Sequence, residues 1–298
     1  MNYDFLTEES VRYLKFIYKK GYKKIPSYNV NQARKIFSDI KEISNQISLP
    51  ILDKQMEANF FEPKSKNSDT LLVFLHGGGY VFRHLPTNIK LCEKLCNETQ
   101  SFVLMPHYFL SPEFKFPYAI QQITDLINKL VLRKIKINGD GFKYIYLCGE
   151  SSGANLAASS AINLEENKKS GIILICPSLD YSNNHATKIS YSQGLLLDKE
   201  VRDWFSFQYL NSEEEKNNPL VSPLKVEDYN KFSNTLIISA KYDPLYSEAC
   251  FFYNQTKKYT NISFFEYPTI HGFMSLGINP YIQDAITDIK KFIVGPKY

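Results

Sequence analysis

The sequence predicts an α/β fold in which a mostly parallel sheet lies between layers of helices. Short apolar runs rich in β-branched and aromatic residues recur at residues 71–75, 102–105, 144–148, 172–176, 236–240 and 262–265. Runs of this kind are typical of strands buried on both faces of a parallel sheet. Helix-length stretches alternate with them, at residues 87–99, 118–133 and 248–259. Alternation of this kind gives a doubly wound sheet, which binds ligands beyond the carboxyl ends of its strands.

Length and composition fit a globular protein rather than a nucleic-acid-binding or membrane-spanning one. The 298 residues are enough for one large α/β domain or two small ones. Lys and Arg number 35 against 31 Asp and Glu, and this balance is too small to favour nucleic acid as a partner. The first residues carry Asp4, Glu8 and Glu9 without an apolar run, so we expect no signal peptide. No segment approaches the roughly 18 apolar residues that a membrane span needs.

The cysteines indicate a reducing environment. Their number, five, is odd, and no CxxC pair or metal-like Cys/His spacing is present. Cys148 and Cys176 lie inside apolar runs, where a thiol behaves as a small buried hydrophobe. We therefore expect free thiols, a cytoplasmic location, and neither a metal ion nor another cofactor.

Two regions fall outside the alternation of strands and helices. Thr7 can cap a helix with a stripe of apolar residues, and a second helix is predicted at residues 31–47. Residues 1–50 would thus form N-terminal helices ahead of a catalytic domain at 51–298. An insertion at about residues 181–222 contains a predicted helix at 198–209, and such an insertion over an α/β sheet is typical of a lid. We expect both regions to cap the strand ends.

The clearest motif is the Gly-Glu-Ser-Ser-Gly sequence at residues 149–153. It follows the run at 144–148 and precedes a stretch of small residues at 154–161. This order of strand, turn and helix is the context of a nucleophile elbow, in which a strained turn exposes a serine at the end of a strand. The motif makes Ser151 the candidate nucleophile.

A second motif, His76-Gly77-Gly78-Gly79, directly follows the run at 71–75. Glycines present bare backbone N–H groups that can stabilise the oxyanion of a tetrahedral intermediate. The N–H of Ser152, next to the nucleophile, would add a further donor. A phosphate-binding turn is disfavoured because no GxGxxG or P-loop pattern surrounds these residues. We expect His76 to be structural.

The order of residues along the chain selects the candidate base and acid. In hydrolases with this elbow, the acid and then the histidine follow the serine. His185 and His271 both follow Ser151, but His185 lies in the insertion. His271 follows the run at 262–265, at the edge of the sheet where ligands bind, and is the candidate base.

Two aspartates compete for the role of the acid. Asp180 follows the run at 172–176, and Asp243 follows the run at 236–240. Asp243 is one strand nearer to His271, and Pro244 after it favours a turn that lifts the carboxylate off the strand. We favour Asp243 and keep Asp180 as the alternative.

With these residues in place, the chain resembles the hormone-sensitive-lipase-like family of esterases. Residues 76–79 match its HGGG motif, residues 149–153 its GDSAG elbow, and residues 218–224 its DPLxSPL stretch. The resemblance implies an α/β-hydrolase fold with an eight-stranded sheet and a helical cap. It also implies metal-free hydrolysis of carboxylic esters with short or medium acyl chains, with Gly78, Gly79 and Ser152 as oxyanion donors and Gly77 shaping the turn.

Several positions depart from the family pattern. Phe109 stands where the family has Arg, so we expect an ion pair with Glu113 to be lost, and Arg83 and Ser247 are also atypical. The aromatic residues that could form pocket walls, although each could equally be core, are Tyr80, Trp204, Phe205 and Phe207.

The activity expected from these motifs is that of a serine esterase acting on a small-molecule ester. The alternatives are an amidase, peptidase or lactonase with the same triad, because leaving-group choice depends on pocket contacts. A non-catalytic receptor of the same fold is disfavoured because the candidate base is present. The sequence leaves the natural substrate and a possible homodimer open.

Overall fold

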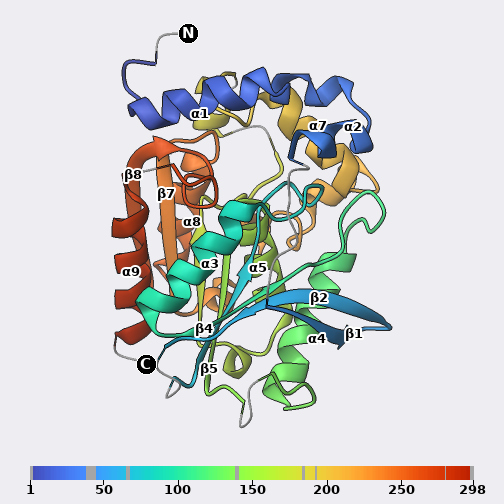
Figure 1. Ribbon diagram of the computed structural model, residues 1–298, viewed down its shortest axis with the longest axis vertical. Coiled ribbons are helices and arrows are strands. Elements are labelled where there is room, and N and C mark those ends of the chain that lie inside the picture. Colours follow the sequence, from blue (N-terminus) through green and yellow to red (C-terminus); the bar gives the residue numbers. More distant parts are fainter. Residues whose placement is uncertain are drawn as a thin grey trace.

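The computed structural model describes residues 3–37, 45–64, 68–137, 141–182, 185–191, 193–278 and 280–295. Its centre is an eight-stranded sheet of order β1-β2-β4-β3-β5-β6-β7-β8 (Figure 1). The strands are β1 Gln46–Ile51, β2 Lys54–Phe61, β3 Thr70–Leu75, β4 Phe102–Pro106, β5 Tyr144–Glu150, β6 Gly171–Ile175, β7 Thr235–Tyr242 and β8 Ile262–Ile270. β2 pairs antiparallel with β1 and β4, and the remaining pairs are parallel. The predicted fold class is confirmed.

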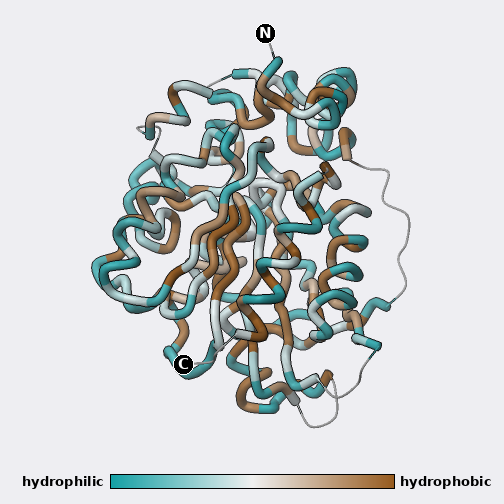
Figure 2. The backbone as a smooth tube through the Cα atoms, turned by 90° about the vertical axis from the view of Figure 1, so that its left-hand side faces the viewer, coloured by the Kyte–Doolittle hydropathy of each residue, from teal (hydrophilic) through white to brown (hydrophobic). Residues whose placement is uncertain are grey.

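Helices cover both faces of the sheet. They are α1 Glu8–Lys19, α2 Val30–Arg34, α3 Pro86–Thr99, α4 Tyr118–Val131, α5 Ser152–Asn163, α6 Ala186–Ser190, α7 Lys199–Tyr209, α8 Tyr246–Thr256 and α9 Ile282–Val294. Successive side chains of a strand point to opposite faces, and on β3 Leu72 and Phe74 pack with α3 and α9. Leu71 and Val73 pack on the other side with α4, α5 and α8. The central strands are accordingly strongly hydrophobic (Figure 2).

The first two strands were not among the predicted runs, and the helix predicted at residues 31–47 is wrong at its end. α2 ends at Arg34 and a 3-10 turn follows at Lys35–Phe37, whereas Gln46 and Ile47 belong to β1. Residues 38–44 lie outside the described part. Most β1 side chains are not buried, as at the edge of a sheet, so this strand has no continuous apolar run. The sheet thus begins inside the segment 1–50 that was expected to hold cap helices.

The N-terminal segment and the insertion lie together over one end of the sheet, where α1, α2 and α7 are neighbours (Figure 1). The helix predicted at 198–209 corresponds to α7. The indole N–H of Trp204 on α7 donates a hydrogen bond of 3.2 Å to the carbonyl oxygen of Tyr28. This contact joins the two regions that the sequence predicts as a cap.

Arg34 also ties the N-terminal segment to the catalytic domain. Its guanidinium binds both carboxylate oxygens of Glu113, at 2.7 and 2.8 Å, and donates to the carbonyls of Val81 and Ser111. The expected loss of an ion pair at Glu113 is therefore wrong. Phe109 cannot supply the cation, but Arg34 reaches Glu113 from a distant part of the sequence.

All five cysteines are free thiols, and only Cys250 is partly exposed. A search of the described helices finds none with the length and apolar character of a membrane span.

The packing of α7 gives a prediction with a matched control. Trp204 is 8% exposed, whereas Phe207 on the same helix is 73% exposed. We expect Trp204→Ala to lower the free energy of unfolding by roughly 3 kcal/mol, because it opens a cavity between α7 and the N-terminal segment. Phe207→Ala should change it by no more than about 0.5 kcal/mol. Urea unfolding followed by circular dichroism measures both, and equal losses would contradict the packing described here.

Candidate active site

Ser151 lies in the tight turn between β5 and α5, as the motif predicts. Its φ of 60° and ψ of −122° are strained for a residue with a side chain. A Cβ atom on Gly153 would lie 2.0 Å from the carbonyl oxygen of Leu75, so only glycine lets α5 approach β3 this closely. The close approach fixes the start of the helix and holds Ser151 at the carboxyl end of β5.

Two loops bring a histidine and an aspartate to Ser151. His271 directly follows β8, and its Nε2 lies 2.8 Å from Ser151 Oγ. Its Nδ1 lies 2.7 Å from Oδ2 of Asp243, which directly follows β7. The other carboxylate oxygen of Asp243 accepts a 2.8 Å hydrogen bond from the Leu245 N–H. The candidate nucleophile, base and acid therefore form one continuous chain of hydrogen bonds.

The charge of Asp243 governs the basicity of His271. Burial disfavours the charged imidazole, but the Asp243 carboxylate and its hydrogen bond outweigh burial, and the pKa of His271 is raised above its ordinary value. Asp243 is fully buried, so little solvent screens this pair.

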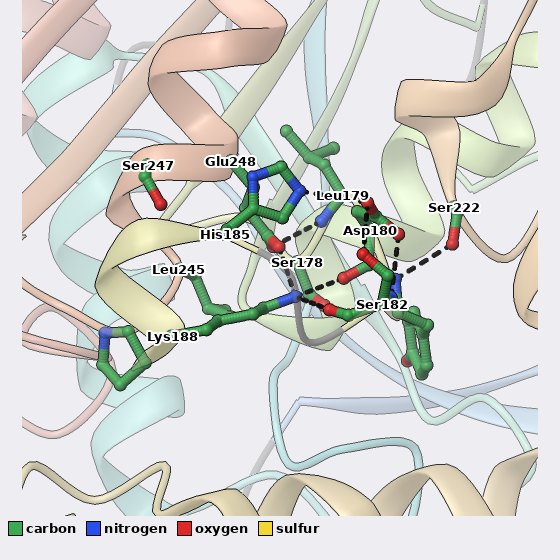
Figure 3. Close-up of polar contacts among 12 residues, drawn as sticks. Ser178, Leu179, Asp180, Ser182, His185, Lys188, Ser222, Leu245, Ser247 and Glu248 are labelled. Carbon is green, nitrogen blue, oxygen red and sulfur yellow. Dashed lines mark hydrogen bonds and ion pairs between the residues drawn. The ribbon is translucent and has the colours of Figure 1, made fainter. Parts of the chain in front are cut away.

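Asp180, the alternative acid, has other partners. Its carboxylate accepts hydrogen bonds from His185 Nε2 at 3.0 Å and from the N–H and hydroxyl of Ser182, both at 2.8 Å (Figure 3). Burial opposes its ionisation, but these hydrogen bonds prevail and lower the pKa of Asp180. The structure thus brings Asp243, and not Asp180, to His271.

The glycine loop after β3 lies beside Ser151. Gly77, Gly78 and Gly79 line the same cavity as Ser151, and Ser152 begins α5. Within the described ranges, no protein group accepts a hydrogen bond from the backbone N–H groups of Gly78, Gly79 or Ser152. The N–H of Ser152 is in addition one of the unpaired donors at a helix N-terminus. The loop and the helix start together offer donors for a developing negative charge.

His76 contacts this glycine loop and the residues that follow β4. Its ring stacks on Tyr108 at a centroid distance of 4.4 Å, and its Nδ1 lies 2.7 Å from the carbonyl oxygen of Gly77. Burial lowers the pKa of His76 to about 3, so the ring is neutral. These contacts agree with a structural role.

An apolar cavity of about 100 Å³ opens beside Ser151. His271 lies on its wall together with Phe205 of α7 and with Tyr13 and Ile17 of α1. The sequence gives no direct signal for these wall residues, because a helix stripe shows which side chains are buried but not what they cover. The N-terminal segment therefore contributes directly to the cavity at Ser151.

Of the aromatic residues proposed as pocket walls, only Phe205 lines this cavity. Tyr80 is buried against Tyr209, with ring centroids 3.8 Å apart, and donates to Asn155 Oδ1 at 2.6 Å. Trp204 packs on Phe82 and Tyr28, and Phe207 points to the surface. The structure thus contradicts Phe207 as a wall and gives Tyr80 and Trp204 packing positions.

Glu150, which the sequence analysis did not assign, also lines the cavity. It is 1% exposed, and one of its oxygens accepts from the Ser275 N–H at 2.9 Å. Burial raises the pKa of Glu150. A buried carboxyl at this place holds the loop after His271 against the elbow.

In the described ranges, one group of side chains has ligand atoms close enough for a metal ion, with Cys176, Asp243 and His271 within 4.8 Å of one another. The Nδ1 of His271 is already bonded to Asp243. Burial raises the pKa of the Cys176 thiol well above its ordinary value, which disfavours the thiolate that a metal needs. A metal here would also break the His271–Asp243 hydrogen bond.

Comparisons with known proteins agree with the fold. A sequence model described as the alpha/beta hydrolase fold matches residues 72–275. The chain is 28% identical over 243 residues to vegetative-specific protein H5 of Dictyostelium discoideum, covering 75% of this chain and 71% of that protein. It is 25% identical over 207 residues to an arylesterase of Saccharolobus solfataricus, covering 68% and 67%. An esterase structure from Pyrobaculum calidifontis has a TM-score of 0.81 at 24% identity, covering 90% and 93%, and at that identity the likeness shows the fold alone.

The basicity of His271 can be measured directly. We expect Asp243→Asn to lower the pKa of His271, because it removes the carboxylate that favours the charged ring. Asp180→Asn is the matched control, because this carboxylate has other partners, and it should leave the pKa of His271 unchanged. Histidine-labelled NMR titration measures both variants. An unchanged titration of His271 in Asp243→Asn would show that this pair does not set its basicity.

Proposed function

This chain belongs to the family of proteins with the alpha/beta hydrolase fold, and we propose that it is a serine hydrolase of carboxylic esters. The observation that carries the proposal is the chain of hydrogen bonds from Ser151 through His271 to Asp243, at 2.8 and 2.7 Å. The family match also agrees with the resemblance of the motifs to hormone-sensitive-lipase-like esterases.

In the proposed mechanism, Ser151 Oγ attacks the ester carbonyl while His271 Nε2 takes its proton. His271 then gives this proton to the leaving alcohol, and an acyl group remains on Ser151. Water attacks the acyl-enzyme by the same route and releases the acid. Asp243 keeps the imidazole in the tautomer whose Nε2 accepts a proton, and stabilises the imidazolium.

The proposed oxyanion donors are the N–H groups of Gly78, Gly79 and Ser152, with Gly77 shaping the loop. Support comes from the absence of any competing acceptor for these donors in the described ranges. Removing one such donor costs roughly 3–4 kcal/mol of transition-state stabilisation in other serine hydrolases.

Short and medium acyl esters are the proposed substrates. The apolar cavity beside Ser151 is small, about 100 Å³, and residues of α1 and α7 form part of its wall. A covered site of this size excludes water and favours single small molecules over aggregated lipid. The similarity to the arylesterase of Saccharolobus solfataricus supports an ester as the substrate.

A panel of nitrophenyl esters from acetate to palmitate, with one anilide, tests the proposal. We expect the protein to hydrolyse the short esters, at a rate that EDTA does not diminish. Ser151→Ala should lower turnover on the order of 10⁶-fold. A fluorophosphonate probe should label the native protein once, at Ser151. Loss of activity on chelation, labelling elsewhere, or hydrolysis of the anilide alone would contradict the proposal.

The N-terminal segment gives a further prediction. Removing residues 1–37 takes Tyr13 and Ile17 from the cavity wall but leaves every described strand in place. We expect lower kcat/KM for short esters and more binding of a hydrophobic dye, because apolar surface is uncovered. Labelling of Ser151 by a small phosphonate probe serves as the control for an intact catalytic domain. Unchanged kinetics from acetate to octanoate would show that the segment is not part of the substrate site.

A further inference from the structure

A second cavity also has Ser151 on its wall. Its volume is about 70 Å³, and it shares Gly79, Ser151, Leu197 and Phe205 with the apolar cavity. Its remaining walls carry ionisable side chains, namely Asp180, Lys188, Arg202, Asp203 and Lys216. The two cavities thus offer different chemistry to the two halves of a substrate that reacts at Ser151.

The position of His271 indicates which half of an ester enters which cavity, if the proposed function holds. The leaving alcohol takes its proton from His271 Nε2, so it must lie beside that ring. His271 lines the apolar cavity and is not on the wall of the charged one, whereas Ser151 and Gly79 line both. The alcohol therefore occupies the apolar cavity, and the acyl group extends into the charged one.

Lys188 and Asp180 on the wall of the charged cavity already have partners. Lys188 Nζ lies 2.5 Å from a carboxylate oxygen of buried Glu248, and it donates to the carbonyl oxygens of Asp180 and Ser182 (Figure 3). The Asp180 carboxylate accepts from Ser182 and His185 (Figure 3). Neither charge is free to hold a ligand.

Two further charges on the wall are also paired. Asp203 binds Lys199 at 2.5 Å, and Lys216 binds Glu213 at 2.7 Å. Both pairs lie toward the solvent side of the insertion, where Lys199 is 54% and Glu213 is 78% exposed.

Arg202, unlike the other charged residues on this wall, has no ion-pair partner among the described residues. Among the described residues, no carboxylate lies within 4 Å of its guanidinium. It donates to the carbonyl oxygens of Leu197 and Lys188, which uses two of its five N–H donors, and its buried Nε has no acceptor. Burial lowers the pKa of Arg202 although Asp203, Glu248, Asp198 and Asp243 act on it from beyond contact distance, so an anionic ligand in contact with this guanidinium would stabilise its charge.

Ser206 lies one helical turn after Arg202 on α7 and lines the same cavity. It is 5% exposed, and its hydroxyl has no hydrogen-bond partner among the described residues. Arg202 and Ser206 thus line one small space next to the nucleophile, and each has a buried donor without a partner among the described residues.

We propose that the acyl group of the substrate carries a carboxylate that Arg202 and Ser206 bind. Substrates of this class are half-esters of short dicarboxylic acids, since a cavity of about 70 Å³ leaves little room for a longer chain. A guanidinium matches a carboxylate in geometry and charge. The reaction remains ester hydrolysis, in which the bond from the acyl carbon to the alkoxy oxygen breaks and water supplies the new oxygen.

The test compares monoethyl succinate with ethyl butyrate, which release ethanol and differ only in the terminal carboxylate. We expect a higher kcat/KM for monoethyl succinate. Arg202→Gln should reduce this preference roughly tenfold to hundredfold, the range for hydrogen bonds to charged groups. Arg12→Gln, the same change at an exposed position of α1, is the control and should leave the preference intact.

The outcomes separate this inference from the proposed function. Hydrolysis of neither ester would overturn both. Hydrolysis of ethyl butyrate without a preference for the half-ester, or a preference that survives Arg202→Gln, would overturn the inference alone. If a fluorophosphonate does not label Ser151 in the Arg202→Gln variant, the variant has lost its active site and a second experiment on the native protein tests the proposal. In that experiment succinate should inhibit ester hydrolysis at a lower concentration than butyrate does. Equal inhibition by the two acids would contradict the proposal.

Discussion

The arrangement of the site depends on one close contact, between the start of α5 and the end of β3. Gly153 lets the helix backbone lie against the Leu75 carbonyl oxygen, and Ser151 has a positive φ in the same turn. Because the glycine loop begins directly after β3, the same contact places Gly78 and Gly79 beside the nucleophile. β7 and β8 pair in parallel as far as Tyr242 and Ile270, so Asp243 and His271, which directly follow these strands, lie at the same edge of the sheet as this turn.

Much of this could be predicted from the sequence, because it is local. Six apolar runs correspond to six strands, and the elbow motif, the glycine loop and the order of serine, aspartate and histidine identify the residues that the structure brings together. β1 was missed because most side chains of this edge strand are not buried and it has no continuous apolar run, and β2 because Lys54, Gln55 and Glu57 interrupt its first half. Phe207 was misplaced because composition alone cannot tell which side of a helix faces a cavity.

The remaining features depend on contacts between distant residues. Arg34 replaces the cation missing at Phe109, and Lys188 pairs with Glu248, and no local pattern predicts either contact. Such pairs determine how the segments over the sheet attach to it and which charges near Ser151 remain available. Arg202 stands out only when the partners of its neighbours are known. The residues that select a substrate are therefore harder to predict from the sequence than the serine, histidine and aspartate of the candidate active site.

The central claim is that Ser151 and His271 act as one unit in ester hydrolysis. A double-mutant cycle on kcat with a short nitrophenyl ester tests this claim most directly, using Ser151→Ala, His271→Ala and the double variant. Residues that act as a unit are strongly non-additive, so the double variant should lose no more activity than either single one. Losses that multiply in the double variant would contradict the account.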